Sequence, residues 1–429
     1  MNDTQINDYI NKYLPVKLKE KDKYGEVFTP PHLINDILDL FPSAVWTNPH
    51  LKWFDPSAGV GFFMIFVFKR LLTGLQSWEP NLKKRSSHIL NKMIYMAEIN
   101  KTNCRIIQAF FGPNANIFCG DFLDYPLNSF NCIVGNPPFN DDYGLNNDGK
   151  RILGGKNKLY ERIFIKSYHL LDRYGFLAFI VPANMFSGNG SDAYRIFLEN
   201  SIPVIHFNSS NKRWFPTIQH DLCYFLLEKT EEISKNTNKT VIQYNNSEFT
   251  AILKDRPVNP IMNWTPKTEK LIDTFVSNER NAVIYNRGKN KSAYRGTKYR
   301  VVYTPTTTLG TNNSDLAVGL SQPKAIVFAI SPKLEFVMDY DGSKGTGPNT
   351  LIIPFHTTAE GNKLEHFLRS DDYKAMALAT KTSRQYLKLA FLEHLILTKI
   401  LNKSKSKSKS KYTRKTRANN RVIKTRKNT

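Results

Sequence analysis

Short apolar runs that alternate with amphipathic helical stretches constrain the fold of this chain more than any other feature. The segment 159–175 is one such helical stretch, which Gly175 should end. Strands that alternate with helices predict an α/β fold, in which a parallel sheet is covered by helices on both faces. Seven runs read as strands, at 51–55, 93–99, 116–120, 130–135, 176–182, 202–208 and 222–228.

The pattern changes after a polar stretch at 229–240, which reads as a linker. Beyond it the sequence predicts mixed strands and late helices, which indicate a second, α+β domain. The last segment is low in complexity and is predicted to be disordered. We therefore expect three parts, at 1–230, 241–402 and 403–429. The later elements are expected at 324–331, 335–342, 363–376 and 383–401, with a Gly-rich turn at 342–349.

The charge of the chain favours a polyanionic partner. Residues 403–429 hold twelve Lys and Arg and no acid; subtracting these twelve from the net charge of +23 leaves +11 for residues 1–402. A basic surface of this kind indicates nucleic acid, although a merely Lys-rich protein would have a similar balance. No apolar run approaches the ~20 residues of a membrane span. The N-terminal residues do not resemble a signal peptide.

The four cysteines (Cys104, Cys119, Cys132 and Cys223) are scattered without paired spacing. This pattern predicts reduced, buried thiols and no structural zinc or other metal.

A Gly-rich turn follows the first predicted strand and opens a helix. It reads FDPSAGVGF, residues 54–62, in which Gly59 and Gly61 allow a tight turn and close approach of a ligand to the helix amides. Asp55 ends the strand, where open α/β sheets bind ligands. The alternative is a tight turn without a ligand. A nucleoside triphosphatase is not indicated, because the chain has no G-x-x-x-x-G-K-[ST] motif.

Two further acids end the second and third predicted strands. Glu98 is placed to accept the ribose hydroxyls of a nucleoside, unless it is a solvated strand end. Asp121 is placed to accept from an adenine amine with Phe122 against the ring; the alternative is an N-cap. Three acids at successive strand ends, together with the Gly-rich turn, predict a pocket for an adenosine-like cofactor.

The motif NPPF, residues 136–139, follows the fourth predicted strand. An aromatic amine is a poor nucleophile, because its lone pair is delocalised into the ring. Two acceptors, the Asn136 side chain and the Pro137 carbonyl, would hold its hydrogens in the geometry needed for attack on a methyl group. Pro137 and Pro138 stiffen the corner, and Phe139 offers a ring for stacking. The alternative is a corner that only ends the strand.

In this order, the motifs resemble those of S-adenosylmethionine-dependent N6-adenine DNA methyltransferases of the γ class, over roughly residues 24 to 230. The resemblance implies a Rossmann-like sheet of seven strands, a C-terminal target-recognition domain and double-stranded DNA as partner. It also implies roles for Thr29 and Pro30 at the methionine end of the cofactor, for Asp55, Ala58, Gly59 and Gly61 along it, for Glu98 at its ribose, for Asp121 and Phe122 at its adenine, for Asn136, Pro137, Pro138 and Phe139 at a flipped adenine, and for Phe215 as a further stacking candidate.

Several alternatives stay open at this point. The same acceptors would suit a guanine amine in RNA or a glutamine side chain in a protein, and a DNA-binding module without catalysis would keep the basic charge. A fused nuclease is not evident, because the chain has no Glu-x-Lys triplet, although Asp148 and Asp372 begin Asp-x-Lys triplets. The Gly- and Asn-rich loop 140–158 is either a lid over DNA or a disordered insertion. We expect a monomer or weak dimer in the cytoplasm or nucleus, with no membrane contact.

Overall fold

A computed structural model describes most of the chain outside its two ends. The predictions for the basic tail, for the loop 140–158 apart from Lys158 and for most of the linker lie outside the described residues. These are 29–139, 158–188, 191–208, 214–215, 221–230, 239–244, 247–261, 264–281, 283–286, 294–330, 333–380, 387 and 389–402.

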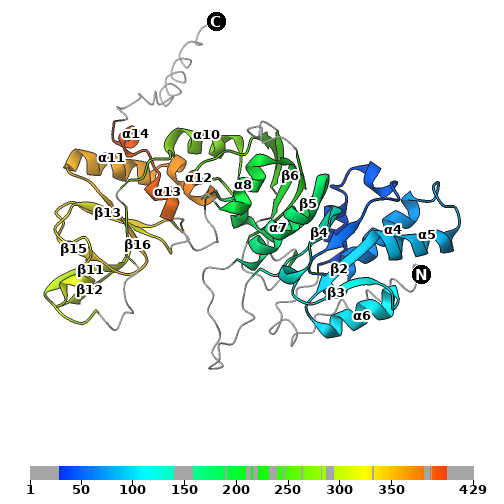
Figure 1. The fold of residues 1–429 in the computed structure, drawn as a ribbon. Helices are drawn as coiled ribbons and strands as arrows, with labels where there is room; N and C mark the ends of the chain where they lie inside the picture. Colours follow the sequence, from blue (N-terminus) through cyan, green and yellow to red (C-terminus); the bar gives the residue numbers. More distant parts are fainter. Residues whose placement is uncertain are drawn as a thin grey trace, which may run out of the picture.

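The first half of the chain forms one sheet, with the strand order β3-β2-β1-β4-β5-β7-β6-β8-β9 (Figure 1). All seven predicted runs are strands of this sheet, in part or in full. The expected seven-stranded parallel sheet needs two corrections: the sheet has nine strands, and β7 runs antiparallel to β5 and β6. The strands are β1 (Trp53–Asp55), β2 (Ile94–Glu98), β3 (Asn116–Cys119), β4 (Phe130–Gly135), β5 (Leu171–Pro182), β6 (Ser201–Asn208), β7 (Leu222–Glu228), β8 (Thr240–Tyr244) and β9 (Ser247–Ala251).

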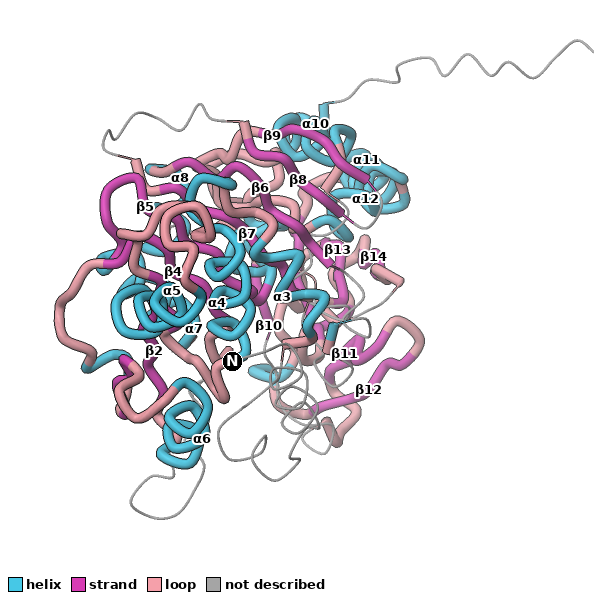
Figure 2. The backbone as a smooth tube through the Cα atoms, turned by 90° about the vertical axis from the view of Figure 1, so that its right-hand side faces the viewer, coloured by secondary structure: helices cyan, strands magenta, loops and turns pink. Residues whose placement is uncertain are grey.

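Strands β8 and β9 directly follow the polar stretch that reads as a linker. β8 pairs in parallel with β6, and β9 returns antiparallel to β8. Figure 2 shows both strands continuing the sheet between β6 and α10 (Pro266–Phe275). Strands β8 and β9, which lie almost entirely in the span 241–402 expected as the second domain, therefore extend the sheet of the first half.

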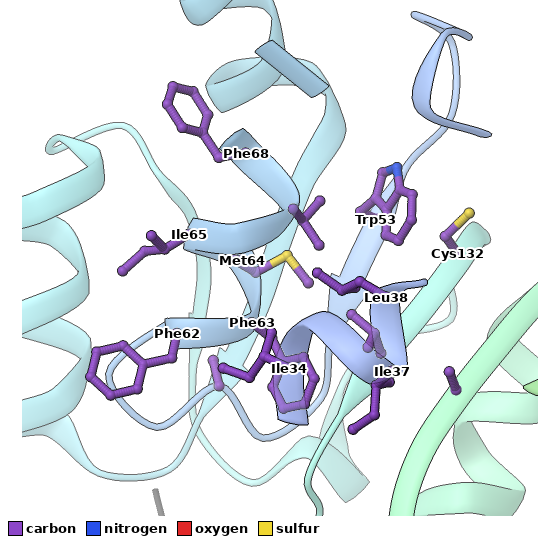
Figure 3. Close-up of a cluster of buried hydrophobic side chains, with 14 of the residues drawn as sticks. Ile34, Ile37, Leu38, Trp53, Phe62, Phe63, Met64, Ile65, Phe68 and Cys132 are labelled. Carbon is purple, nitrogen blue, oxygen red and sulfur yellow. The ribbon is translucent and has the colours of Figure 1, made fainter. Parts of the chain in front are cut away.

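Helices cover both faces of this sheet, as the alternation of strands and helices predicts. On one face α3 and α4 pack over β1 and β4, with Ile37, Met64, Trp53 and Cys132 in a single apolar cluster (Figure 3). On the other face α7 and α8 pack on a second cluster that includes Phe54. The elements between the strands are α3 (Pro31–Leu38), η1 (Ser43–Trp46), α4 (Phe62–Gly74), α5 (Leu82–His88), η2 (Ile89–Met93), α6 (Lys101–Phe111), η3 (Phe122–Asp124), α7 (Leu159–Leu170), η4 (Ala183–Phe186) and α8 (Asp192–Glu199).

The second half contains two smaller sheets and several helices. A four-stranded sheet has the order β10-β16-β13-β14, and a three-stranded sheet has the order β12-β11-β15. The strands are β10 (Ile284–Asn286), β11 (Tyr299–Thr304), β12 (Thr307–Thr311), β13 (Lys324–Phe328), β14 (Phe336–Asp339), β15 (Lys344–Thr346) and β16 (Thr350–Pro354). The helices after α10 are η6 (Ser314–Leu316), α11 (Thr358–Arg369), α12 (Asp371–Ala379), α13 (Leu389–Glu393) and α14 (Leu397–Asn402).

Three predicted helices end or break earlier than their periodicity suggests. The helix expected at 159–175 ends at Leu170, because the chain from Leu171 onward joins the sheet as β5. The helix expected at 363–376 is two helices, α11 and α12, because Ser370 is an N-cap whose side chain accepts from the Tyr373 amide. In the last predicted helix, α13 and α14 are separated by a bridge between Leu395 and Val276.

The cysteines depart from the predicted set of reduced thiols. Cys104 and Cys119 form a disulfide that ties α6 to β3, because these two adjacent elements bring the residues together across a separation of 15 positions. Cys132 and Cys223 are free and buried, and burial raises the pKa of both thiols. In the described part of the chain, no cluster of three or more His, Cys, Asp or Glu side chains is placed to hold a metal ion. No described helix is long and apolar enough to cross a bilayer.

Candidate active site

The carboxyl ends of β1, β2 and β4 bring the predicted site residues to one edge of the sheet. β1 lies between β2 and β4 and is parallel to both, so Asp55 at the end of β1 is flanked by Glu98 at the end of β2 and by Asn136 just after β4. Residues that are 81 positions apart in the sequence therefore meet at the place where such sheets bind ligands.

The Gly-rich turn between β1 and α4 is held to the end of β2 by hydrogen bonds. The Gly59 amide donates to Glu98 Oε2 and the Asn100 amide to Glu98 Oε1, each over 2.7 Å. Gly61 has φ +86°, and a side chain there would also press on the ring of Phe111 at 3.1 Å. The Glu98 carboxylate is thus fixed in place at the end of β2.

Asp55 is a buried acid whose environment disfavours its charged form. Its Oδ1 accepts from the Ser57 amide over 3.0 Å, and burial raises the pKa of the carboxyl to about 8, with a smaller contribution from Glu98. A Cβ on Gly135 would lie 2.7 Å from Asp55 Oδ1. Gly135 was not predicted as a site residue; its position directly before NPPF is the signal that would have indicated it.

Asn136 is joined to the segment that precedes the sheet. Its Nδ2 donates to Thr29 Oγ1 over 3.2 Å, and Thr29 is buried. Thr29 and Pro30 lie immediately before α3, which begins at Pro31. The bond orients the amide group with its NH2 toward Thr29, so two residues 107 positions apart in the sequence are in contact.

Phe139 lies half-buried against α7. Its ring meets the ring of Tyr160 edge-on, with centroids 6.5 Å apart, and the Tyr160 hydroxyl donates to Asn184 Oδ1 over 2.9 Å. Asn184 lies in η4, directly after β5. Burial raises the pKa of Tyr160, which keeps the hydroxyl protonated and able to donate. Sequence reasoning missed Tyr160, because it reads as one apolar position of α7.

Asp121 and Phe122 lie on the turn after β3, where Asp121 caps a short helix and Phe122 packs in the core. Asp121 is exposed, and its Oδ1 accepts from the Leu123 amide over 2.9 Å as the N-cap of η3. Phe122 is buried and packs against Phe54, with centroids 5.6 Å apart. The Lys166 ammonium donates to the Leu123 and Tyr125 carbonyls over 2.6 and 2.7 Å, which holds this turn against α7.

The remaining candidates contribute to the same edge or to the core beneath it. The buried Ala58 donates its amide to the Ala97 carbonyl over 3.0 Å, which ties the Gly-rich turn to β2. Pro137 is buried and Pro138 half-buried. Phe215 is buried in the apolar cluster against which Phe139 also packs, so the two candidate stacking rings share one cluster.

The sheet order and the residues at its carboxyl edge define a methyltransferase-like α/β fold. Residues 67–215 match the family model of the Eco57I restriction-modification methylases, a span that includes NPPF. The match confirms the resemblance to adenine-specific DNA methyltransferases that the motifs indicate.

Two curated proteins are similar to this chain. An uncharacterized adenine-specific methylase of Mycoplasma pneumoniae is 25% identical, over 49% of this chain and 69% of its own length. The modification methylase CviBIII of Paramecium bursaria Chlorella virus NC1A is 24% identical, over 56% of this chain and 60% of its own length. The chain therefore spans about two thirds of the length of these relatives.

Solved structures share the fold across most of the chain. The Type IIL restriction-modification enzyme MmeI superposes with a TM-score of 0.58 and 12% identity, over 88% of this chain and 69% of that one. The Type ISP enzyme LlaGI gives a TM-score of 0.58 and 12% identity, over 89% of this chain and 47% of that one. At this identity the two likenesses describe the fold, and they include the second half of the chain.

Proposed function

We propose that this chain transfers a methyl group from S-adenosylmethionine to the exocyclic N6 amine of an adenine in DNA. The observation that carries the proposal is the contact between Asn136 and Thr29 at the edge where Asp55 and Glu98 also end their strands. An amine-binding motif and a cofactor-binding pattern are thus adjacent. The names of the two curated relatives, both methylases and one of them adenine-specific, support the same reaction.

The residues at this edge fit the cofactor in charge and shape. Glu98, with both oxygens fixed by amides, would accept the ribose hydroxyls, and the glycines of the turn give a ligand access to the backbone. When bound, S-adenosylmethionine supplies an electrophilic methyl group. Asp55 lies beside this turn, and its ionised form would favour a positively charged ligand. Thr29 and Pro30 would contact the methionine end, and Asp121 and Phe122 would bind the adenine.

Asn136 and the Pro137 carbonyl would hold the target amine. Each accepts one hydrogen of the amine, which directs the nitrogen lone pair out of the plane of the base and toward the methyl group. The new N–C bond would form from that lone pair while the methyl–sulfur bond breaks and leaves its electron pair on the sulfur, and the nitrogen would then release one proton to solvent. Phe139 would stack on the base, with Tyr160 supporting the ring from its edge.

DNA is the proposed polymer. The solved structures of MmeI and LlaGI, which share this fold, contain DNA or a DNA substrate mimic. The +11 charge of residues 1–402 and the basic segment 403–429 suit a phosphate backbone. Residues after the catalytic sheet would select the target sequence, with the chain a monomer or weak dimer. Activity on DNA would place the protein inside the cell, in cytoplasm or nucleus.

The proposal is tested by incubating the protein with S-adenosylmethionine labelled in its methyl group and with double-stranded DNA, single-stranded DNA or RNA. The products are digested to nucleosides and separated. We expect label in N6-methyl-2′-deoxyadenosine from the duplex. Label in cytosine, in RNA nucleosides or in the protein itself would overturn the assignment of base or polymer, and absence of label in all three polymers would overturn the activity.

A further inference from the structure

Two basic side chains lie side by side on the small sheet of the second half. In the parallel pair β11·β15, Arg300 is the register partner of Lys344, and on the other side of β11 it is the partner of Gly310. Register partners on neighbouring strands point to the same face of a sheet. The guanidinium of Arg300 and the ammonium of Lys344 therefore share one face, beside a position that has no side chain.

The surroundings of this pair are basic. Arg300 is exposed and Lys344 half-buried, and among the described residues neither side chain forms an ion pair. Arg295 and Lys298, just before β11, are exposed too, and residues 294–311 contain no acid. Like charges on paired strand positions are destabilising, so this arrangement costs stability in the isolated protein.

Two acids lie near Lys344 in the sequence, and the buried one, Asp339, is balanced by another cation. The carboxylate of Asp339 is fully buried against Lys324, with Nζ and Oδ2 2.5 Å apart. The exposed Asp341 accepts from the Ser343 amide over 3.0 Å. Since Lys324 offsets Asp339, the charge of Lys344 is not balanced by the buried acid beside it.

The same buried pair fixes the backbone that carries Lys344. Asp339 Oδ2 accepts from the Lys344 amide over 3.2 Å as well as from Lys324. At the other end of β15, the Thr346 carbonyl accepts from Asn286 Nδ2 over 2.6 Å. Because β15 is held at both ends, the backbone of Lys344 is in a defined position. This lowers the conformational entropy that is lost when a ligand binds to its side chain.

We propose that Arg300 and Lys344 form a contact surface for the phosphates of DNA on the face of β12-β11-β15. This inference rests on the proposed function, since it takes DNA as the polymer. The two cations are complementary in charge to the DNA backbone, which places negative charge at regular short intervals. The repulsion between the two cations is relieved when a phosphate lies between them. Rigid placement on two adjacent strands distinguishes the pair from the charges of residues 403–429.

The test is the salt dependence of binding to duplex DNA, measured with the full chain by fluorescence anisotropy. The double variant Arg300→Gln/Lys344→Gln removes both charges and keeps polar side chains of similar length. A matched control, Lys363→Gln, removes an exposed charge from α11, at the opposite end of the second half in Figure 1. Removal of one phosphate-binding cation should reduce the slope of log K against log salt by about 0.9.

We expect the double variant to bind about tenfold more weakly at low salt and its slope to fall by up to ~1.8. Its thermal midpoint should be unchanged or higher, because a repulsive pair has been removed. Lys363→Gln should match the wild type in slope. A double variant that keeps the wild-type slope, or that binds RNA more weakly but DNA as tightly as the wild type, overturns the inference.

This outcome is separate from that of the methylation assay. If the wild type binds DNA through these residues but transfers no methyl group, the contact surface stands and the proposed function fails. If the wild type methylates DNA and the double variant binds as tightly at every salt concentration, the proposed function stands and the contact surface fails.

Discussion

The carboxyl edge of the nine-stranded sheet and the small sheets of the second half are built on different principles. At the edge, buried or half-buried polar groups from separate segments of the chain meet within hydrogen-bonding distance, as Asn136 and Thr29 do. In the second half, the cations of β11 and β15, Arg300 and Lys344, are register partners at exposed or half-buried positions. Bond making requires a few groups in fixed positions, whereas binding to a polymer adds many weaker contacts over a surface.

The largest expected effect is on the rate of methyl transfer. It is measured by substituting one residue in each of the two regions. Asn136→Ala removes the proposed acceptor of the target amine and keeps both prolines of the corner. Methyl transfer should fall by on the order of a hundredfold or more. Arg300→Ala should leave the rate at saturating DNA within a few fold. Both are measured as single-turnover rates, with cofactor and DNA affinity as controls for folding.

An Asn136→Ala variant that is folded and transfers methyl groups near the wild-type rate would show that the corner only ends β4. A large decrease in single-turnover rate for Arg300→Ala at saturating DNA would show that the second half takes part in the chemical step. Either result would remove the division between the two regions.

A smaller effect compares two acids within the first region. Glu98 accepts from two amides, so Glu98→Gln turns one acceptor into a donor that faces an amide. Hydrogen bonds to charged groups contribute ~1.5–3 kcal/mol, and cofactor affinity should fall by roughly tenfold to a hundredfold. Asp121→Asn keeps an acceptor for the Leu123 amide and should cost only a few fold.

Calorimetric titration with S-adenosylmethionine measures both variants. Equal decreases in affinity would mean that Asp121 contributes to the pocket as much as Glu98 does, although it is exposed. Unchanged affinity for Glu98→Gln would remove β2 from the cofactor site.

The smallest expected effect is a change in thermal stability with pH, and it follows from the different surroundings of two buried acids. Asp339 lies against Lys324, whereas the neighbour that contributes to the pKa of Asp55 is another acid, Glu98. The pKa of Asp55 is raised from 3.8 to about 8, so the folded state binds a proton that the unfolded state releases between these values. The stability of the folded state therefore decreases as pH rises through this window.

The thermal midpoint of the wild type should fall relative to that of Asp55→Asn as pH is raised from about 5 to about 8, by a few degrees. Scanning calorimetry without cofactor gives both curves. Parallel curves across this range would mean that Asp55 titrates near its ordinary pKa and that its burial does not penalise its charge.

The sequence predicted the first region well because its signals are local. An apolar run ended by Gly or Pro specifies a strand and its end, and in a parallel sheet all such ends meet at one edge. The positions of Asp55, Glu98 and Asn136 at that edge follow from this rule. The contact of Phe139 with Tyr160 does not, because it depends on how α7 packs against the corner that follows β4.

Other features depend on pairings that no local pattern encodes. β8 is short and follows a polar stretch. Its pairing with β6 depends on which edge strand of the sheet still has unpaired backbone groups. The disulfide between Cys104 and Cys119 depends on the alignment of α6 with β3. In the second half, β15 is a three-residue strand inside a segment that reads as a Gly-rich turn. Nonlocal packing decided each of these cases.

The extension of the sheet by β8 and β9 has a consequence for hybrid enzymes. Exchange of the second half between this chain and its relatives requires a junction, and the polar stretch at 229–240 is the boundary that the sequence suggests. A junction there would remove β8 and expose the unpaired backbone of β6 along its length, which invites edge-to-edge aggregation. A junction after Ala251 leaves the sheet complete, so the engineer's boundary lies eleven residues beyond the end of the apparent linker at residue 240.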